Sequence, residues 1–234
     1  MGEAGSRFAS DLEAAGAEVH GHDPAVPGRF DGGGSAVEGA DVVLSLNSAR
    51  VAAQAARDAL PGLAPGAVYA DLNTTAPDLK RELAGLVGER FADVALLGPV
   101  PIRGLGTRAL ASGPGARTFA DVLGPLGMPV QVISARAGDA ATMKLVRSVF
   151  TKGLGASVVE SMRAAEAAGH GDWLSDEIAA VIGQEMVERL LEGSSKHAAR
   201  RVDEMEAAAA LLVDLGVQPR IANASAAVLA DLAD

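Results

Sequence analysis

The 234-residue chain contains no cysteine, which excludes disulfides, thiolate metal sites and a cysteine nucleophile. Aromatic residues make up only 3% of the sequence against 49% hydrophobic residues, so the core must consist mainly of Ala, Val and Leu. Long apolar runs are also missing, because stretches such as 207–213 are far too short to span a bilayer. The first residues lack the basic and apolar regions of a secretory signal. We therefore expect a soluble cytoplasmic protein without a membrane partner.

Positively charged residues are also few, because the chain has 20 Lys and Arg but 30 Asp and Glu, which gives a net charge of −10 at pH 7. Without a basic cluster to offset it, this excess disfavours nucleic acid as a partner. The four histidines show no metal-ligand spacing, so we expect no metal site. The chain has only four lysines, at positions 80, 144, 152 and 196, so each of them is considered as a candidate functional residue.

Short β-rich runs alternate with helical stretches over residues 1–134, which is typical of an α/β domain with parallel strands and crossover helices. We expect strands at residues 17–22, 41–46, 67–72, 93–97, 109–112 and 130–134. We expect helices at residues 6–15, 49–59, 77–87 and 116–123. The run at 41–46, Asp-Val-Val-Leu-Ser-Leu, is nearly all apolar, as in strands that are buried on both faces.

Residues 135–234 carry no strand signal and are predicted to form an all-helical domain. The proline-free, Ala-rich stretch from 138 to 169 predicts one helix of roughly 30 residues, on the order of 45 Å long. Further helices are expected at 173–191, 195–215 and 222–232, with helix stops at 193–195 and 216–219. Because so long a helix cannot bury its whole apolar face within one small domain, we expect a homodimer through this domain.

The segment Gly2-Glu3-Ala4-Gly5 leads directly into the first helical stretch. A helix that begins after a glycine turn presents unpaired N–H groups and the positive end of its dipole, which suits a pyrophosphate. Asp23 follows about 20 residues later, the spacing at which an acidic residue binds the adenosine ribose in dinucleotide sites. This pattern predicts NAD or NADP, with NAD favoured because a carboxylate repels a 2′-phosphate. The alternative is a plain helix start with a surface aspartate.

Two loops follow expected strands, at the edge where parallel sheets bind their ligands. Thr74 lies in the first loop, Asp-Leu-Asn-Thr-Thr-Ala-Pro at 71–77, although this segment can equally be a turn that leads into the next helix. The second loop, 97–104, contains Pro101 and Arg103, and a rigid loop with one cation suits an anionic substrate such as a carboxylate. Otherwise Arg103 is a solvated surface residue.

Polar residues recur at helical spacing on the long helix and form one stripe, which comprises Lys144, Arg147, Ser148, Thr151 and Lys152. A polar stripe on a largely buried helix should face a cleft, because unpaired polar groups are costly to bury. A lysine in a cleft can protonate or deprotonate a substrate oxygen, which makes Lys144 a candidate catalytic residue. The alternative is a solvated helix face that carries no chemistry.

Taken together, these segments resemble the β-hydroxyacid dehydrogenases, a family that includes 3-hydroxyisobutyrate and 6-phosphogluconate dehydrogenases. Residues 2–5 resemble the end of the family's G-x-G-x-x-G fingerprint, and residues 71–77 resemble its D-x-S-T-x-x-P segment. Pro99-Val100 matches the P-V of D-A-P-V-S-G-G, and residues 138–144 resemble G-x-G-x-x-x-K. The resemblance implies a Rossmann-like parallel sheet that lacks its first strand, followed by an all-helical domain. It also implies hydride transfer between NAD(P) and a small hydroxy acid or related anion.

The resemblance assigns roles to single residues. It places the cofactor at Gly2, Glu3, Ala4, Gly5 and Asp23, with the nicotinamide beside Asn47 and Thr74, and it makes Lys144 the proton relay. We expect Pro101 and Arg103 to bind the substrate, with Arg103 attracting its negative charge, and Ser148 to orient the substrate or Lys144. The family's Ser-Gly-Gly is replaced by residues 101–103 and its Asn by Ser148, which leaves the substrate open. Because the missing strand is normally central, a second hypothesis is a catalytically degenerate dimeric scaffold or nucleotide-sensing protein of the same fold.

Overall fold

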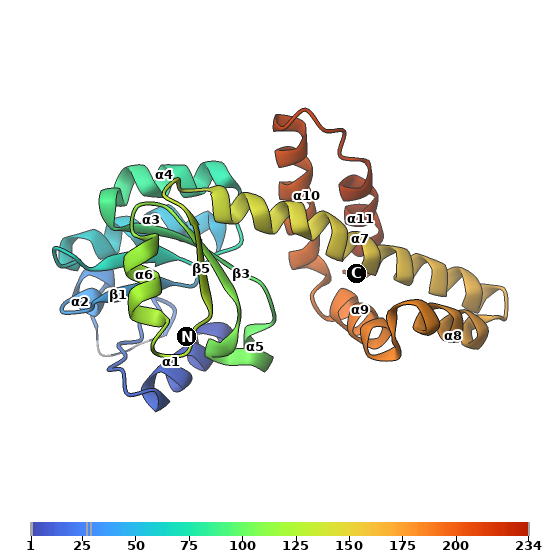
Figure 1. The fold of residues 1–234 in the computed structure, drawn as a ribbon, viewed down its shortest axis with the longest axis horizontal. Coiled ribbons are helices and arrows are strands. Elements are labelled where there is room, and N and C mark those ends of the chain that lie inside the picture. The colour runs from blue at the N-terminus through green and yellow to red at the C-terminus, as the bar shows by residue number, and fades with distance from the viewer. Residues whose placement is uncertain (1, 27, 29, 234) are drawn as a thin grey trace. The chain divides into compact units, whose positions relative to one another are not determined.

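The computed structural model describes residues 2–26, 28 and 30–233 of the chain. Two compact units follow one another in sequence, Met1–Lys144 and Leu145–Asp234. The first contains a five-stranded sheet with helices, and the second consists of helices (Figure 1). The predicted fold class, an α/β domain followed by an all-helical one, is confirmed.

The sheet has the order β1-β2-β3-β4-β5, formed by Val42–Ser45, Val68–Asp71, Phe91–Leu96, Ala109–Ser112 and Val130–Ser134. Strands β1, β2 and β3 are parallel, and so are β4 and β5, but β4 is antiparallel to β3. The expectation of parallel strands throughout is therefore wrong. The connection from β3 to β4 holds only the four-residue helix α5 (Val100–Arg103) and a 3₁₀ turn, which do not form the helical crossover that a parallel pair needs.

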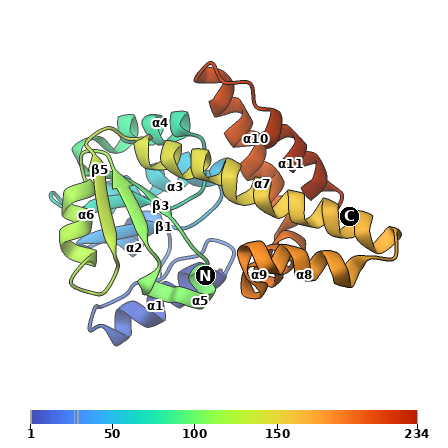
Figure 2. The same cartoon turned by 45° about the vertical axis from the view of Figure 1, so that its right-hand side comes forward.

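Helices cover both faces of the sheet (Figure 2). On one face, Phe8 and Phe119 pack against the strands, and on the other face the helices pack against Tyr69 and Phe91. Every residue of β2, β3 and β4 is buried, so these strands are the centre of the core. The helices on the first face are α1 (Glu3–Ala14) and α6 (Ala116–Leu123), and those on the second are α2 (Gly33–Val37), α3 (Ala49–Ala59) and α4 (Pro77–Val87).

The segment 17–22, which the sequence predicts to be a strand, does not form one, since no ladder in the described part of the chain includes it. A strand requires a neighbour that satisfies its backbone hydrogen-bonding groups. Here Ala17 and Val19 pack against the core without such a neighbour. Strand β1 consequently forms an edge of the sheet as far as the described residues extend, with β2 as its partner.

The second unit is built around the long helix that the sequence predicts. Helix α7 (Asp139–Ala167) has 29 residues and begins in the first unit before it continues into the second. Met205, Ala222 and Leu229 are buried in the core that the last two helices share. No helix within the described ranges is both long and apolar enough to cross a membrane. The remaining helices are α8 (Gly171–Ile182), α9 (Gln184–Lys196), α10 (Ala198–Asp214) and α11 (Arg220–Ala230).

Two predicted helix boundaries in this unit are wrong. The expected helix 173–191 is interrupted at Gly183, whose φ of +84° ends α8, and α9 continues through Gly193 to Lys196. A glycine inside a helix costs only about 1 kcal/mol, and the guanidinium of Arg201 lies against Gly193. The stop predicted at Gly216 is confirmed, because this residue has a φ of +73° directly after α10.

Candidate active site

Two asparagines lie side by side where β1 and β2 end. Asn47 follows β1 and Asn73 follows β2, and these strands are parallel neighbours. The backbone N–H of Asn47 donates to Asn73 Oδ1 over 2.6 Å, and Asn73 Nδ2 donates to Asn47 Oδ1 over 2.8 Å. Ligands of such sheets bind at the carboxyl ends of parallel strands, so this pair marks a candidate site.

Lys144 of α7 reaches the same edge of the sheet. Its Nζ donates a hydrogen bond of 2.6 Å to Oγ1 of Thr74, the residue that follows Asn73. Lys144 is half-buried and Thr74 is exposed. The structure thus brings together the side chain that the sequence assigns to proton transfer and one that it assigns to the nicotinamide.

A buried ion cluster lies next to this edge. Lys80 of α4 is fully buried, and its Nζ donates to Asp71 Oδ1 over 2.6 Å and to the Asp71 carbonyl over 2.8 Å. The same Nζ lies 3.2 Å from Asp93 Oδ1 of β3, as an ion pair without hydrogen-bond geometry. Asn73 Nδ2 donates to the second oxygen of Asp71 over 2.6 Å. The cluster therefore connects α4 and β3 to the asparagine pair.

Asp93 also binds the start of α7. Its Oδ2 accepts the N–H groups of Gly138 and Ala141 over 3.0 and 3.1 Å. Ser112 Oγ donates to the same oxygen over 3.0 Å and accepts the N–H of Ala140 over 3.0 Å. A carboxylate here satisfies N–H groups that have no acceptor within the helix, and it complements the helix dipole. The first turn of α7 is thus fixed to β3 and β4.

Sequence reasoning missed Lys80 and Asp93, because charged residues are seldom buried. A signal was present in both cases. Lys80, Leu83 and Val87 share one face of a helix by their spacing, which puts the lysine on the apolar side of α4. Asp93 stands within Phe91–Leu96, a strand whose residues are all buried. A cation and an anion at two inward-facing positions indicate a buried pair.

Helix α1 holds the short helix α5, which contains Pro101 and Arg103, so the loop expected at 97–104 is partly helical. Arg7 Nη1 donates to the Pro101 carbonyl over 3.2 Å, and Asp11 Oδ2 accepts the N–H of Leu105 over 2.7 Å. The hydrogen bond from Leu105 lowers the pKa of Asp11 below its ordinary value, and Arg7 acts in the same direction. Arg103 is exposed at the end of α5, where its charge is accessible to an anion.

Residues 2–5 form the start of α1. Gly2 is the N-cap, with an extended backbone (φ −69°, ψ 176°), and Glu3, Ala4 and Gly5 make the first turn. No side chain among the described residues caps this end, and the first N–H groups of a helix have no acceptor within it. A Cβ added at Gly2 would meet no atom within 4 Å, so the space beside this turn can admit a ligand.

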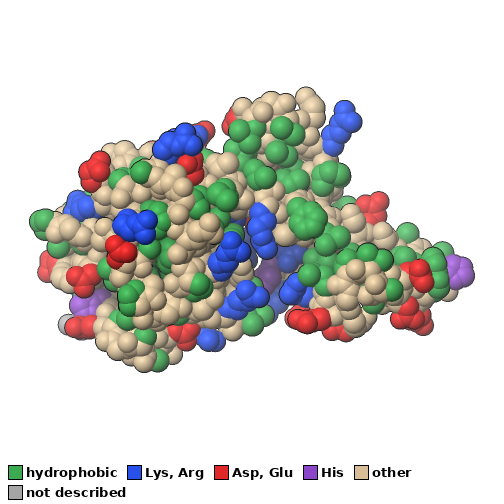
Figure 3. All heavy atoms as spheres, in the orientation of Figure 1, with side chains coloured by type: hydrophobic (Ala, Val, Ile, Leu, Met, Phe, Trp, Pro, Cys, Tyr) green, Lys and Arg blue, Asp and Glu red, His purple; other side chains and the backbone are tan. Residues whose placement is uncertain are grey.

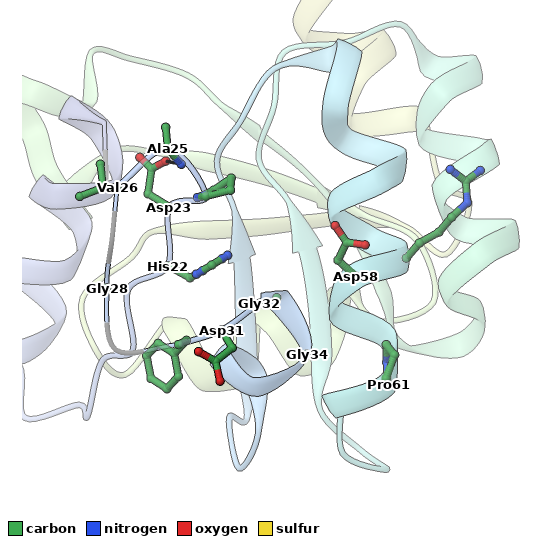
Figure 4. Close-up of a pocket in the computed structure, with 14 residues that line it drawn as sticks. His22, Asp23, Ala25, Val26, Gly28, Asp31, Gly32, Gly34, Asp58 and Pro61 are labelled. Atoms are coloured by element: carbon green, nitrogen blue, oxygen red, sulfur yellow. Dashed lines mark hydrogen bonds between the residues drawn. The ribbon is translucent and has the colours of Figure 1, made fainter.

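Asp23 lies on the wall of a cavity of about 760 Å³ between the 22–34 loop and the end of α3 (Figure 4). Its Oδ1 accepts the N–H of Ala25 over 3.0 Å, and this hydrogen bond lowers the pKa of Asp23. In Figure 4 His22 points into the space that faces Asp58 of α3. The volume is in the range of small-molecule sites. No group of three or more His, Asp or Glu suited to a metal ion occurs among the residues that the structure describes.

Ser148 belongs to a polar cluster within the helical unit. Its hydroxyl is buried and donates to Glu204 Oε1 over 2.5 Å, and Lys152 Nζ donates to the same oxygen over 2.9 Å. Burial lowers the pKa of Lys152, although the charge of Glu204 opposes this shift. The polar stripe predicted on α7 therefore turns Ser148 and Lys152 toward α10, whereas Lys144 contacts Thr74 of the first unit.

Comparison with known sequences gives two partial matches. Residues 165–232 match the model of a family described as a domain of unknown function, DUF1932. A relative from Methanothermus fervidus, described as an uncharacterized 28.5 kDa protein in the 7S RNA 5′ region, is 29% identical over 142 residues. This match covers 59% of the chain and 55% of the relative, so the chain spans about half the length of that protein.

Solved structures match almost the whole chain. MTH1747, a conserved protein of unknown function with structural similarity to 3-hydroxyacid dehydrogenases, is 27% identical, with a TM-score of 0.74 over 99% of this chain and 93% of that chain. The 3-hydroxyisobutyrate dehydrogenase of Mycobacterium tuberculosis, solved with L-serine, is 20% identical, with a TM-score of 0.80 over 99% and 91%. The chain is therefore similar in fold to these 3-hydroxyisobutyrate dehydrogenase-like structures, as the resemblance in its sequence predicts, and part of its helical unit matches the DUF1932 model.

Proposed function

We propose that this chain is an NAD(P)-dependent oxidoreductase that transfers hydride to or from a small hydroxy acid or a related anion. The observation that carries the proposal is the hydrogen bond of 2.6 Å between Lys144 Nζ and Thr74 Oγ1. It holds an ammonium group at the carboxyl edge of parallel strands, in a chain with the fold of 3-hydroxyisobutyrate dehydrogenases. An amine in that position can pass a proton to or from a substrate oxygen.

The proposed reaction consists of two transfers, one of a hydride and one of a proton. When bound, NAD(P) would supply hydride transfer at the carbon that bears the hydroxyl group, in either direction. In the oxidation direction the neutral amine of Lys144 accepts the hydroxyl proton, and in the reduction direction its ammonium donates a proton to the carbonyl oxygen. Thr74 restricts Nζ to one position, which favours the reaction because reacting groups must be aligned.

The residues of the first unit fit a dinucleotide. The uncapped first turn of α1 offers the N–H groups of Glu3, Ala4 and Gly5 to a pyrophosphate, with open space at Gly2. Asp23 lines a cavity of a size that suits the adenosine half, and its lowered pKa keeps it ionised as an acceptor for ribose hydroxyls. The carboxylate supports a preference for NAD over NADP, because a 2′-phosphate would face a like charge.

An anionic substrate is supported by Arg103, an exposed cation at the end of α5, which Arg7 of α1 holds in place through the Pro101 carbonyl. The M. tuberculosis protein was solved with L-serine, a small molecule that carries both a hydroxyl group and a carboxylate. Ser148 lies one helical turn after Lys144 on α7 and is fully buried, with its hydroxyl bound to Glu204. Of the two roles predicted for it, we therefore keep only that of a residue that orients Lys144 through the helix.

The proposal includes a cytoplasmic homodimer that forms through the helical unit. Phe150 and Ile221 are 72% and 59% exposed, although both are large and apolar. They line an apolar groove of about 490 Å³ that α7, α10 and α11 form, and hydrophobic side chains gather over these helices in Figure 3. Contiguous apolar surface of this kind usually marks a protein interface. The net charge of −10 argues against nucleic acid as the partner.

A binding and turnover experiment tests the proposed function. The purified chain is titrated with NADH and NADPH while nicotinamide fluorescence is followed, and a set of 3-hydroxy acids is then assayed. We expect Lys144→Ala to bind nucleotide nearly normally but to lower kcat roughly 100- to 10,000-fold. The exposed Lys196 provides the control, and Lys196→Ala should alter neither quantity. Full kcat in Lys144→Ala would contradict the proton-relay role.

One observation favours the second candidate, a dimeric scaffold or nucleotide-sensing protein without turnover. The segment 17–22, which leads to Asp23, forms no strand, and β1 is an edge of the sheet within the described residues. A nucleotide site that depends on that region would then be loosely organised. A dimer that neither binds NAD(H) or NADP(H) nor oxidises any hydroxy acid would support the scaffold, whereas binding without turnover would support the sensor.

A further inference from the structure

We infer that Lys80 and Asp93 are positioning residues for Lys144, an inference that rests on the proposed function. Both side chains are fully buried, so they act through the protein and not on the substrate. They belong to different elements, since Lys80 lies on α4 and Asp93 on β3. Between them they fix both partners of the hydrogen bond that Lys144 makes with Thr74.

The first step runs from Asp93 to the helix that carries Lys144. Asp93 Oδ2 accepts the N–H groups of Gly138 and Ala141 over 3.0 and 3.1 Å. Lys144 follows Ala141 by three residues, so it lies on the next turn of the same helix. Because a helix is stiff over so short a distance, a shift of its first turn would move the backbone of Lys144 by a similar amount.

The second step runs from Lys80 to Asp93. One oxygen of this carboxylate lies 3.2 Å from Lys80 Nζ, and the other receives the N–H groups of α7. With both oxygens engaged, the carboxylate can neither rotate nor leave the helix without breaking an ionic contact. Without Lys80, Asp93 and Asp71 would be two buried like charges with no cation between them, and their repulsion would disturb the contact of Asp93 with the helix.

The third step runs from Lys80 to the loop that carries Thr74. Lys80 Nζ donates to Asp71 Oδ1 over 2.6 Å, and the other oxygen of Asp71 accepts from Asn73 Nδ2 over 2.6 Å. Asn73 is in turn paired with Asn47 of the neighbouring strand end. A single ammonium group therefore fixes the loop on one side and, through Asp93, the helix on the other side.

Lysine labelling measures the position of Lys144 directly and needs no cofactor. The chain has only four lysines, so an amine-acylating reagent followed by peptide mass spectrometry reports each of them separately. We expect Lys144 to react more slowly than the exposed Lys196 in the unaltered chain, because Thr74 and partial burial restrain it. In Asp93→Asn the rate at Lys144 should rise toward that at Lys196.

Kinetics supply the second readout. Asp93→Asn should lower kcat about 100-fold, the effect of moving a reacting group by roughly 1 Å, while KM for the nucleotide changes little. Asp78 lies on the exposed side of the same helix as Lys80, and Asp78→Asn is the matched control that should leave kcat and labelling unchanged. A purely structural cluster would lower the melting temperature but would leave both Lys144 labelling and the kcat of the folded variant as they are.

Ser112→Ala is a milder second variant in case Asp93→Asn fails to fold, because it leaves the charges of Lys80, Asp71 and Asp93 in place. It removes two hydrogen bonds, the one that Ser112 Oγ donates to Asp93 Oδ2 and the one that it accepts from the Ala140 N–H. It should change Lys144 labelling in the same direction as Asp93→Asn but by less. Unchanged Lys144 labelling in the folded variants would overturn the inference. If the unaltered chain neither binds nucleotide nor turns over a hydroxy acid, the proposed function fails. Labelling of Lys144 would still decide whether Lys80 and Asp93 position it.

Discussion

Lys144 and Thr74 lie 70 residues apart in the sequence, yet Lys144 Nζ donates a hydrogen bond of 2.6 Å to Thr74 Oγ1. One comes from the long helix α7 and the other from the loop between β2 and α4. Their contact places an ammonium group at the ligand-binding edge of the sheet. The proposed chemistry depends on this pairing, and the first prediction addresses it.

Thr74→Val should lower kcat by about tenfold, because it removes the acceptor that holds Lys144 while it keeps the shape of the side chain. The neighbouring Thr75 is a matched control, since its Oγ1 is buried and makes no hydrogen bond within the described part of the chain. Thr75→Val should therefore leave kcat unchanged and should not reduce stability. Steady-state kinetics with saturating nucleotide test both variants, and equal kcat values for them would argue against a role for the Thr74 contact.

Asp23→Asn should reduce the affinity for NAD by about tenfold, since a charged acceptor for the ribose hydroxyls is lost. The affinity for NADP should fall less or rise, because the repulsion of the 2′-phosphate disappears as well. Asp31 also lines this cavity and is exposed, so Asp31→Asn controls for a general change in charge. Fluorescence titration of both variants with NADH and with NADPH, the fluorescent reduced forms, measures the four affinities. A similar response of both variants would place the ribose elsewhere.

Gly104→Ala should lower the free energy of unfolding by at least about 1 kcal/mol, the cost of a left-handed backbone in a residue with a side chain. Gly104 has a φ of +52°, and a Cβ there would overlap Asp11 Oδ2 and crowd the guanidinium of Arg7. Gly106 belongs to the same 3₁₀ turn but has open space around it, so Gly106→Ala should be close to neutral. Chemical denaturation compares the two, and equal losses would mean that α1 does not dock on this turn.

The chain has a single tyrosine, and the pKa of its phenol reports how deeply the residue is buried in the core. Burial raises the pKa of Tyr69 to about 12 from its ordinary value of 10.0, and the charge of Asp71 adds to the effect. The phenol therefore stabilises the folded state fully below pH 10, and this contribution is lost as the pH rises through the folded pKa. Tyrosinate absorbance should show a midpoint near 12 in the folded chain and near 10 in denaturant. A midpoint near 10 in the folded chain would show that β2 is not central.

Local signals in the sequence were sufficient for most of the secondary structure. Helices Ala49–Ala59, Pro77–Val87 and Ala116–Leu123 form at the bounds that their apolar spacing predicts. The long helix α7 was predictable because no proline interrupts it. The segment 17–22 was not, since a strand depends on a neighbour as well as on its own residues. The antiparallel direction of β4 was missed for a similar reason, because the direction of a strand depends on how the chain returns to the sheet.

Several side chains of the candidate site could be named from the sequence, but their arrangement could be predicted only in part, and their chemistry stays a prediction. Lys144 and Thr74 could be assigned from motifs, although nothing in either motif shows that the two side chains meet. Lys80 was not recognised, because a lysine on a helix is normally exposed and its buried position depends on Asp71 and Asp93 from two different strands. Such long-range pairs arise from the packing of the whole unit, so local spacing cannot reveal them.

A crystal structure of the chain with NADH or NADPH and a hydroxy acid tests the central claim most directly. The account predicts the diphosphate at the first turn of α1, the adenosine ribose at Asp23 and the nicotinamide beside Thr74. Lys144 Nζ should then lie about 2.7–3.2 Å from the substrate oxygen. A nucleotide bound at another surface, or a substrate oxygen out of reach of Lys144, would contradict the account.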